Sequence, residues 1–389
     1  MKKLLLILMT LFITIIGYSQ TFTENHITYS VTSTVPNTVT VLDYNLSGGT
    51  DVVIPASVTE TSSSKTSSSK NETNIMASYD VTGIAYQAFL NKGITSVIIP
   101  NSVVSIGTGA FHGNLLTSVV LPDGLTAINQ SCFSNNQLTS ITIPDSVLTI
   151  GTQAFSVNFI TSAILGNSVA TIGINAFYNN NLTTITIPNS VTTIDFRAFD
   201  DNLLANVIIG NGVTTIGDHA FRDNPLTCVS SLATTPPTIT TGTNDSFGTS
   251  RSNINLTVPT GTTAAYVTDS GALWTGFNSV TENSGNTFIL DNITYVITSS
   301  NTITATDYNT AGGTVVNIPA TVTSTCITYS VTSIGHAAFA NNQLTDIIIP
   351  DSVVTIGSDA FQNNDITTLV IGNNVVSIDE GAFAFNDLP

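Results

Sequence analysis

The sequence predicts a β-rich solenoid, a fold in which short coils of chain stack on one another, and three observations lead to it. Phenylalanine recurs at intervals of 22 residues along two stretches of the chain. The residues between successive phenylalanines repeat one pattern of apolar and turn-forming types. The segment before the first stretch is rich in β-branched residues, and nearly the same text returns before the second stretch.

The recurring phenylalanine defines position 1 of the repeat. It is occupied by Phe89, Phe111, Phe133, Phe155, Phe177, Phe199 and Phe221, and later by Phe339, Phe361 and Phe383. A single unit of this length is too small to bury its own apolar side, whereas stacked units cover one another. We therefore expect these ten side chains to form the shared structural core of the coils.

Each unit contains two short apolar segments. Leu138, Ile141 and Ile143 have the spacing of a strand with one buried face. Val147 and Ile150 supply a second segment after a turn. The repeat therefore predicts two short strands in each coil, and hence two parallel sheets along the stack.

Position 19 of the unit carries residue types that favour turns. It is held by Gly107, Asn129, Gly151, Gly173, Asp195, Gly217, Gly357 and Asp379. Glycine, asparagine and aspartate all tolerate positive φ better than other residues do. We therefore expect a left-handed turn at this position.

Position 4 is asparagine in nine of the ten units. The residues are Asn114, Asn136, Asn158, Asn180, Asn202, Asn224, Asn342, Asn364 and Asn386. Two interpretations stay open. The amides form an inward ladder that satisfies the backbone of neighbouring turns, or they are exposed turn residues.

The unit Leu138–Phe155, which reads LTSITIPDSVLTIGTQAF, resembles the repeat of the BspA-type leucine-rich repeat proteins of bacterial surfaces. The resemblance covers most of the chain after its first residues. It implies a right-handed leucine-rich-repeat superhelix with 22-residue coils, exported to the cell surface or the medium. It also implies adhesion or protein recognition without catalytic residues, although its matching positions are structural and specify fold rather than function.

The chain divides into six expected segments. These are a signal peptide at 1–19, an N-terminal β cap at 20–85 with a low-complexity insertion near 60–78, a first repeat array at 86–227, a non-repeat closing module at 228–285, a second β cap at 286–335 and a second array at 336–389. Caps are expected because a stacked core exposes apolar surface and free strand edges at its ends. We expect the second array to be truncated, because the sequence stops inside a unit.

The first residues predict export. Lys2 and Lys3 precede an apolar run, and small residues follow it, as in a cleavable signal peptide. No later stretch reaches the roughly 20 apolar residues of a membrane span. We therefore expect a secreted or cell-surface protein with no membrane span after cleavage.

The composition argues against several other functions. The chain has 25 acidic and 8 basic side chains and a formal net charge of -17, which disfavours nucleic acids and anionic membranes as partners. Cys132, Cys228 and Cys326 are far apart, so we expect neither a disulfide framework nor a zinc site. The histidines and acidic residues show no metal or catalytic motif. The sequence predicts no cofactor, no metal and no enzyme activity.

The closing module contains Tyr266 and Trp274, which allow two interpretations. The two aromatic side chains form a platform on which a sugar stacks, or they fill the small core of the module. Aromatic residues dominate core burial, which favours the second interpretation.

The alternation within the first strand identifies a candidate binding surface. If positions 9 and 11 point inward, position 10 points outward. Position 10 is Ile98, Val120, Thr142, Ile164, Thr186 and Ile208 in the first array, and Ile348 and Val370 in the second. Small polar residues accompany this stripe at position 8. The stripe is either a protein-recognition face or a consequence of β propensity alone.

The function predicted from these observations is non-enzymatic recognition at the cell surface. The expected partner is a protein or another cell-surface macromolecule. The alternative is a passive spacer, or a targeting module of a larger secreted protein or enzyme whose C-terminal part is missing.

Overall fold

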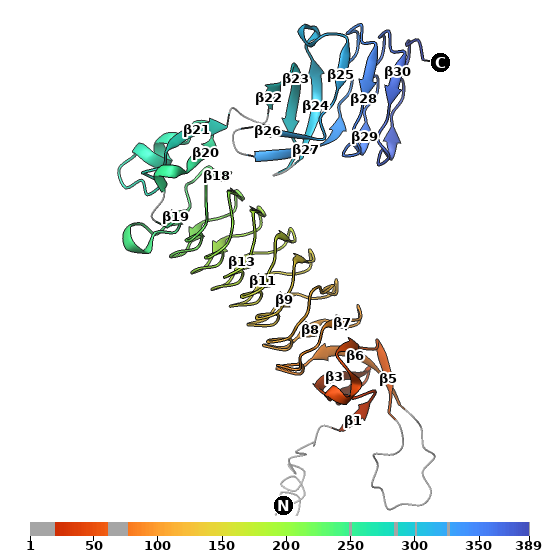
Figure 1. The fold of residues 1–389 in the computed structure, drawn as a ribbon, viewed down its shortest axis with the longest axis vertical. Coiled ribbons are helices and arrows are strands. Elements are labelled where there is room, and N and C mark those ends of the chain that lie inside the picture. The colour runs from red at the N-terminus through yellow and green to blue at the C-terminus, as the bar shows by residue number, and fades with distance from the viewer. Residues whose placement is uncertain are drawn as a thin grey trace, which may run out of the picture.

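The computed structural model of the protein describes residues 20–60, 77–248, 251–283, 287–299, 302–324 and 327–388. The predicted signal peptide, residues 61–76 of the low-complexity insertion predicted near 60–78, and Cys326 lie outside these residues. Figure 1 shows two stacks of short strands joined by a smaller module. The predicted β-rich solenoid is therefore confirmed.

The first cap gives strands to both sheets of the stack that follows it. Its elements are β1 (Thr21–Glu24), β2 (Ile27–Thr34), β3 (Asn37–Tyr44), the 3-10 helix η1 (Leu46–Gly48), β4 (Asp51–Val53), β5 (Ser57–Thr59) and β6 (Ser78–Ile84). Strands β1, β2, β3, β6 and β5 form one sheet, in that order. Strand β6 pairs with β8, and β4 pairs with β7, both in parallel. The cap thereby covers the open end of the first array.

The first array contains the two predicted sheets. The front sheet is built from β7 (Ser96–Ile98), β10 (Ser140–Thr142), β12 (Ser162–Ile164), β14 (Thr184–Ile187) and β16 (Asn206–Ile209). The back sheet is built from β8 (Ser105–Ile106), β9 (Ala127–Ile128), β11 (Thr149–Ile150), β13 (Thr171–Ile172), β15 (Thr193–Ile194), β17 (Thr215–Ile216) and β19 (Thr238–Ile239). Strands pair in parallel with their equivalents one coil later along β9, β11, β13, β15, β17 and β19 of the back sheet. In the front sheet the paired runs are β4–β7, β10–β12 and β14–β16, and Thr142 of β10 lies in register with Ile164 of β12.

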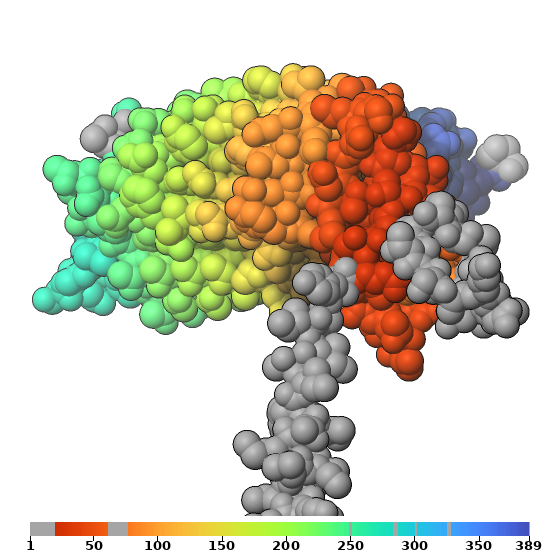
Figure 2. All heavy atoms as spheres, turned by 90° about the horizontal axis from the view of Figure 1, so that it is seen from below, coloured from red at the N-terminus to blue at the C-terminus, as the bar shows by residue number. Residues whose placement is uncertain are grey.

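The recurrent phenylalanines form a column between the sheets. From Phe89 to Phe221 every ring is fully buried, and consecutive ring centroids lie 5.0 to 5.7 Å apart with nearly parallel planes. Phe247 of the closing module continues the column at 5.6 Å. Figure 2 shows the coils from outside, as successive bands of atoms along the first array. Each coil therefore shields the aromatic side chain of its neighbour.

The asparagine ladder is confirmed at eight of the nine asparagines. At the ninth, Asn342, the backbone N–H donates to Oδ1 of Asn364 at 2.9 Å. The Nδ2 atom of Asn180 donates to the carbonyl oxygens of Phe155 and Phe177 at 3.0 and 3.1 Å, and its Oδ1 accepts from the backbone N–H of Ile160 at 3.1 Å. Equivalent bonds to two phenylalanine carbonyls recur at Asn114, Asn136, Asn158, Asn202, Asn224, Asn364 and Asn386. Each amide therefore satisfies backbone groups of neighbouring coils.

The left-handed turn predicted at position 19 is wrong. Positive φ occurs instead on either side of the phenylalanine, for example at Gln153 and Val157 with φ of 57° and 56°. At position 19 a Cβ atom on Gly151 would lie 2.8 Å from the carbonyl oxygen of Ile128. Glycine is used there because the backbones of adjacent coils approach closely. Asn129 at the same position donates through Nδ2 to the Ile106 carbonyl at 2.7 Å.

The closing module extends the front sheet with longer strands. Its elements are β18 (Cys228–Ser231), the 3-10 helices η3 (Gly242–Asn244) and η4 (Arg251–Asn253), β20 (Asn255–Pro259), the π-helix η5 (Ala264–Thr268) and β21 (Ser279–Asn283). Trp274 and Tyr266 are fully buried, so the sugar-platform interpretation is wrong and the core interpretation is right. The Trp274 indole N–H donates to the Pro237 carbonyl at 2.8 Å, and burial raises the pKa of Tyr266 to about 12.

The second cap repeats the plan of the first. Its elements are β22 (Thr287–Leu290), β23 (Ile293–Ile297), β24 (Thr302–Tyr308), the 3-10 helix η6 (Thr310–Gly312), β25 (Val315–Asn317), β26 (Thr321–Ser324) and β27 (Ile327–Ile334). The second array follows with β28 (Asp346–Ile348), β29 (Thr355–Ile356), β30 (Thr368–Val370) and β31 (Ser377–Ile378). Among the residues described, no helix has the length and apolar character needed to cross a membrane.

Candidate recognition face

The outward side of the front sheet carries an apolar stripe. We call Ile98, Val120, Thr142, Ile164 and Thr186 the front stripe. Ile98, Val120 and Ile164 are 62%, 83% and 62% exposed, Thr142 is exposed and Thr186 is half-buried. Because the inward neighbours at positions 9 and 11 face the core, the outward direction of the stripe follows from the strand alternation. These side chains stand in a row along the stack.

One further apolar residue extends the row into the first cap. Val53 of β4 pairs in register with Ile98 of β7 and is 63% exposed. The 22-residue period does not predict Val53, because the cap lies outside that period. The signal was present in the pattern D-V-V-I-P at residues 51–55, which matches the strand and proline of a repeat unit.

Hydroxyl groups line one side of the front stripe. Position 8 presents the exposed side chains of Ser96, Ser118, Ser140, Ser162 and Thr184. At the cap, the hydroxyls of Ser96 and Thr95 donate to the Asp51 carboxylate at 2.7 and 3.0 Å, and these bonds lower the pKa of Asp51. The surface therefore combines β-branched apolar groups with short polar ones.

The prediction that Ile208 belongs to the exposed stripe is wrong. Ile208 is only 8% exposed and belongs to the hydrophobic cluster of the second array, together with Tyr295 and Phe339. Its in-register neighbours on the same face, Ser230 and Thr257, are also buried. Period alone could not reveal this, because the covering surface belongs to a part of the chain outside the first array.

The two predicted stripe residues of the second array are exposed. Ile348 and Val370 are 44% and 50% exposed and pair in register across β28 and β30. Strand β25 precedes them and places Asn317 beside Ile348. The second array therefore presents a shorter version of the front stripe.

The sequence predicts no disulfide framework, yet the structure contains a disulfide. Cys228 in β18 is disulfide-bonded, whereas Cys132 is buried and free. The third cysteine, Cys326, lies outside the described residues. Cysteines separated this widely carry no spacing motif, so no local pattern predicts the bond.

The charged groups of the first array form a structural cluster near its end. Asp200 is fully buried, with Arg222 Nη2 at 2.8 Å and Arg197 Nε at 3.3 Å from Oδ2. Burial raises the pKa of Asp200, and the two guanidinium groups oppose that shift. Across the described part of the chain, no three histidine, cysteine, aspartate or glutamate residues gather as metal ligands would. The outward side of the front sheet therefore provides apolar contact area and hydroxyl groups for binding.

A family model matches most of the described chain. The BspA type leucine rich repeat region matches residues 42–160, 82–205, 170–267 and 317–388. No curated protein matches the chain significantly.

Several solved structures are similar to the chain. A leucine-rich cell surface protein from Faecalibacterium prausnitzii is 20% identical, with 94% of this chain and 80% of that chain covered and a TM-score of 0.35. A leucine-rich repeat protein from Bacteroides ovatus is 20% identical over 88% and 91% of the two chains, with a TM-score of 0.38. The pneumococcal vaccine antigen PcpA is 16% identical over 92% and 71%, with a TM-score of 0.38.

Proposed function

The chain belongs to the BspA-type leucine-rich repeat family, and from this premise we propose that it is an exported, non-enzymatic protein that recognises another protein through its front stripe. The family is a repeat scaffold of bacterial surface proteins and suggests protein–protein recognition or adhesion. The front stripe supplies the surface for that role. Exposed contiguous apolar groups flanked by polar ones are typical of interaction sites.

The observation that carries the proposal is that the outward face of the front sheet is covered by protein at its C-terminal end. There Ile208 is buried in the hydrophobic cluster of the second array. The outward face of the front sheet therefore accepts a protein surface within this chain. Ile98 and Ile164 present the same side-chain type on the same face, and both are 62% exposed.

Two features support export. Lys2 and Lys3 with the following apolar run have the pattern of a cleavable signal, although they lie outside the described residues. The disulfide at Cys228 supports an oxidising location, because disulfides persist outside the cytosol. We therefore place the mature chain at the cell surface or in the medium.

The experiment is capture of immobilised matrix proteins, glycans and whole cells by the mature chain and by two variants. Ile164→Glu places a charge on the front stripe. Leu148→Glu is the matched control, because Leu148 is 51% exposed next to strand β11 of the back sheet. A charge in the centre of an apolar contact costs several kcal/mol of binding, so we expect capture to fall at least about tenfold with Ile164→Glu only.

Equal capture by the two variants would contradict the front stripe as the recognition face. Absence of capture by the unaltered chain would favour the alternative function of a passive spacer or a targeting module of a larger secreted protein. Both variants should keep the stability of the unaltered chain, because both side chains are exposed.

The dependence of capture on salt gives a second test. No Lys or Arg belongs to the front stripe, and its contacts are apolar and hydroxyl groups. Screening acts on charges and leaves apolar contacts nearly unchanged. We expect capture to change less than about twofold between low and physiological salt. A steep loss of capture with added salt would show that charged residues elsewhere carry the binding.

A further inference from the structure

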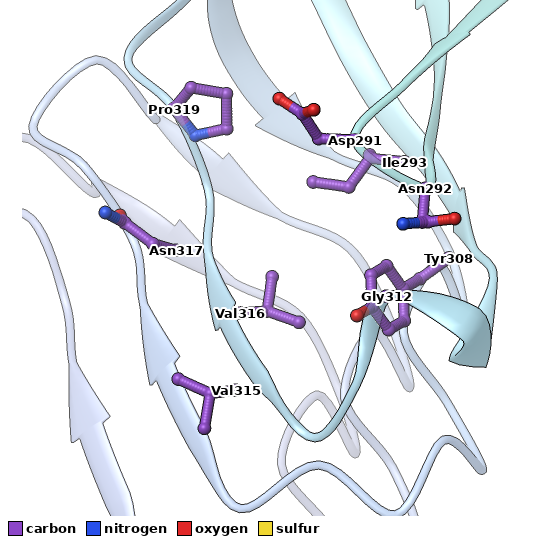
Figure 3. A pocket seen from close by; sticks show the side chains of 9 residues that line it. All are labelled: Asp291, Asn292, Ile293, Tyr308, Gly312, Val315, Val316, Asn317 and Pro319. Carbon is purple, nitrogen blue, oxygen red and sulfur yellow. The ribbon is translucent and has the colours of Figure 1, made fainter.

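The second cap contains a cavity that neither array uses. Its volume is about 290 Å³, and Figure 3 shows it between the β22–β23 turn, helix η6 and strand β25. The Asp291 carboxylate projects toward Pro319 across the opening, while Val316 and the Tyr308 ring lie beneath it (Figure 3). Ile293, Tyr308 and Val316 are buried and form the inner wall. The cavity size suits a small organic ligand.

The first cap carries an exposed histidine side chain at the matching turn. Its β1–β2 turn is Asn25–His26, where the second cap has Asp291–Asn292, and all four residues hold positive φ between 48° and 68°. The His26 ring lies against Gly48, and its Nδ1 is 2.9 Å from the Ser47 hydroxyl.

In the second cap both partners of that contact have changed. His26 is matched by Asn292, and Ser47 is matched by Ala311. The same turn also gains a negative charge, because Asn25 is matched by Asp291. The exchange therefore removes an imidazole and adds a carboxylate at the same place.

The charge around the cavity favours a cation over an anion. The side chains of Asp291 and Asn292 form no hydrogen bond or ion pair with any residue that the structure describes. The Tyr308 hydroxyl is already engaged, since it donates to the Gly313 carbonyl at 3.0 Å. An anion would face the Asp291 carboxylate and a formal net charge of -17. A ring cation would pair with the carboxylate and rest on the Tyr308 ring.

We propose that this cavity binds a small nitrogen-ring cation of the imidazolium class. Its ring takes the place that His26 occupies in the first cap, and a ring N–H donates to the Asp291 carboxylate. This site is separate from the front stripe, so that a failure of either proposal leaves the other standing.

The experiment measures saturation transfer by NMR from the mature chain to imidazole. At about pH 6 imidazole is largely the cation, and two units higher it is neutral, as the histidine side chain is. We expect the signal at the lower pH to be at least about threefold larger, because a charge-assisted hydrogen bond forms only with the cation.

Three variants separate the cavity from the general acidity of the chain. Asn292→His fills the cavity with the residue that the first cap carries, and should abolish the excess signal. Asp291→Asn should remove the pH dependence. Asn25→Asp is the matched control, because it adds the same carboxylate beside the His26 ring, and should leave the signal unchanged.

Both substitutions in the second cap use residues that the first cap holds at the same backbone conformation, so folding should be retained. Unchanged transfer in Asn292→His would overturn the proposal, because the binding would then lie elsewhere. Absence of saturation transfer from the unaltered chain to imidazole would also overturn the proposal. An increase in transfer in Asn25→Asp as large as the signal of the unaltered chain would overturn it as well.

Discussion

The inward and outward sides of the coil differ in how strictly they repeat. On the inward side, phenylalanine and asparagine recur with the same contacts from coil to coil. On the outward side of the front sheet, the residue type changes between isoleucine, valine and threonine, and the environment changes from 83% exposure at Val120 to burial at Ile208. The inward side therefore sets the stacking, and the outward side is free to serve recognition.

The comparison also explains why a chain with few charges can form so long a structure. Consecutive phenylalanine rings stack with interplanar angles as small as 2°. Each ladder asparagine joins two coils, since Asn180 bonds the carbonyls of both Phe155 and Phe177. Each coil is therefore stabilised by its neighbours, as expected for a solenoid.

The largest effect is expected on the inward side, at the aromatic column. Phe177→Ala should lower the free energy of unfolding by about 3 to 5 kcal/mol, because it leaves a cavity between Phe155 and Phe199. Denaturant unfolding measures the change. Phe159→Ala is the control, because Phe159 is 55% exposed and of the same residue type. A loss below about 1 kcal/mol in Phe177→Ala would remove the argument for a shared core.

The asparagine ladder should come second. Asn180→Ala removes three donated bonds and one accepted bond, and leaves the buried N–H of Ile160 without its acceptor. We expect a loss of about 2 to 3 kcal/mol in the free energy of unfolding. Asn167→Ala, at an exposed side chain, serves as the control. Equal losses in the two variants would show that the ladder adds no stability.

A smaller effect is expected where the outward side is covered. Ile208→Glu places a charge against the hydrophobic cluster of the second array, and should cost about 1 to 3 kcal/mol. Ile164→Glu, on the exposed part of the same face, should cost less than about 0.5 kcal/mol. Thermal unfolding of the two variants compares them. Similar stability would mean that the face is equally open along its whole length.

The repeat accounts for most of what could be predicted. Stacking, the two sheets and the asparagine ladder follow from a period that places the same residue against itself in every coil. Ile208 could not be predicted, because its burial depends on how the second array meets the first. The role of the glycines at position 19 could not be predicted, because a close approach of two backbones and a positive φ both favour glycine. The disulfide of Cys228 could not be predicted, because the cysteines of this chain have no spacing motif.

The separation of the two sides is tested most directly by hydrogen–deuterium exchange of the mature chain, alone and with a captured protein partner. Binding through the front stripe predicts slower exchange at strands β7, β10 and β12, and unchanged exchange at strands β11 and β13 of the back sheet. Slower exchange confined to the back sheet, with the front strands unaffected, would contradict the account.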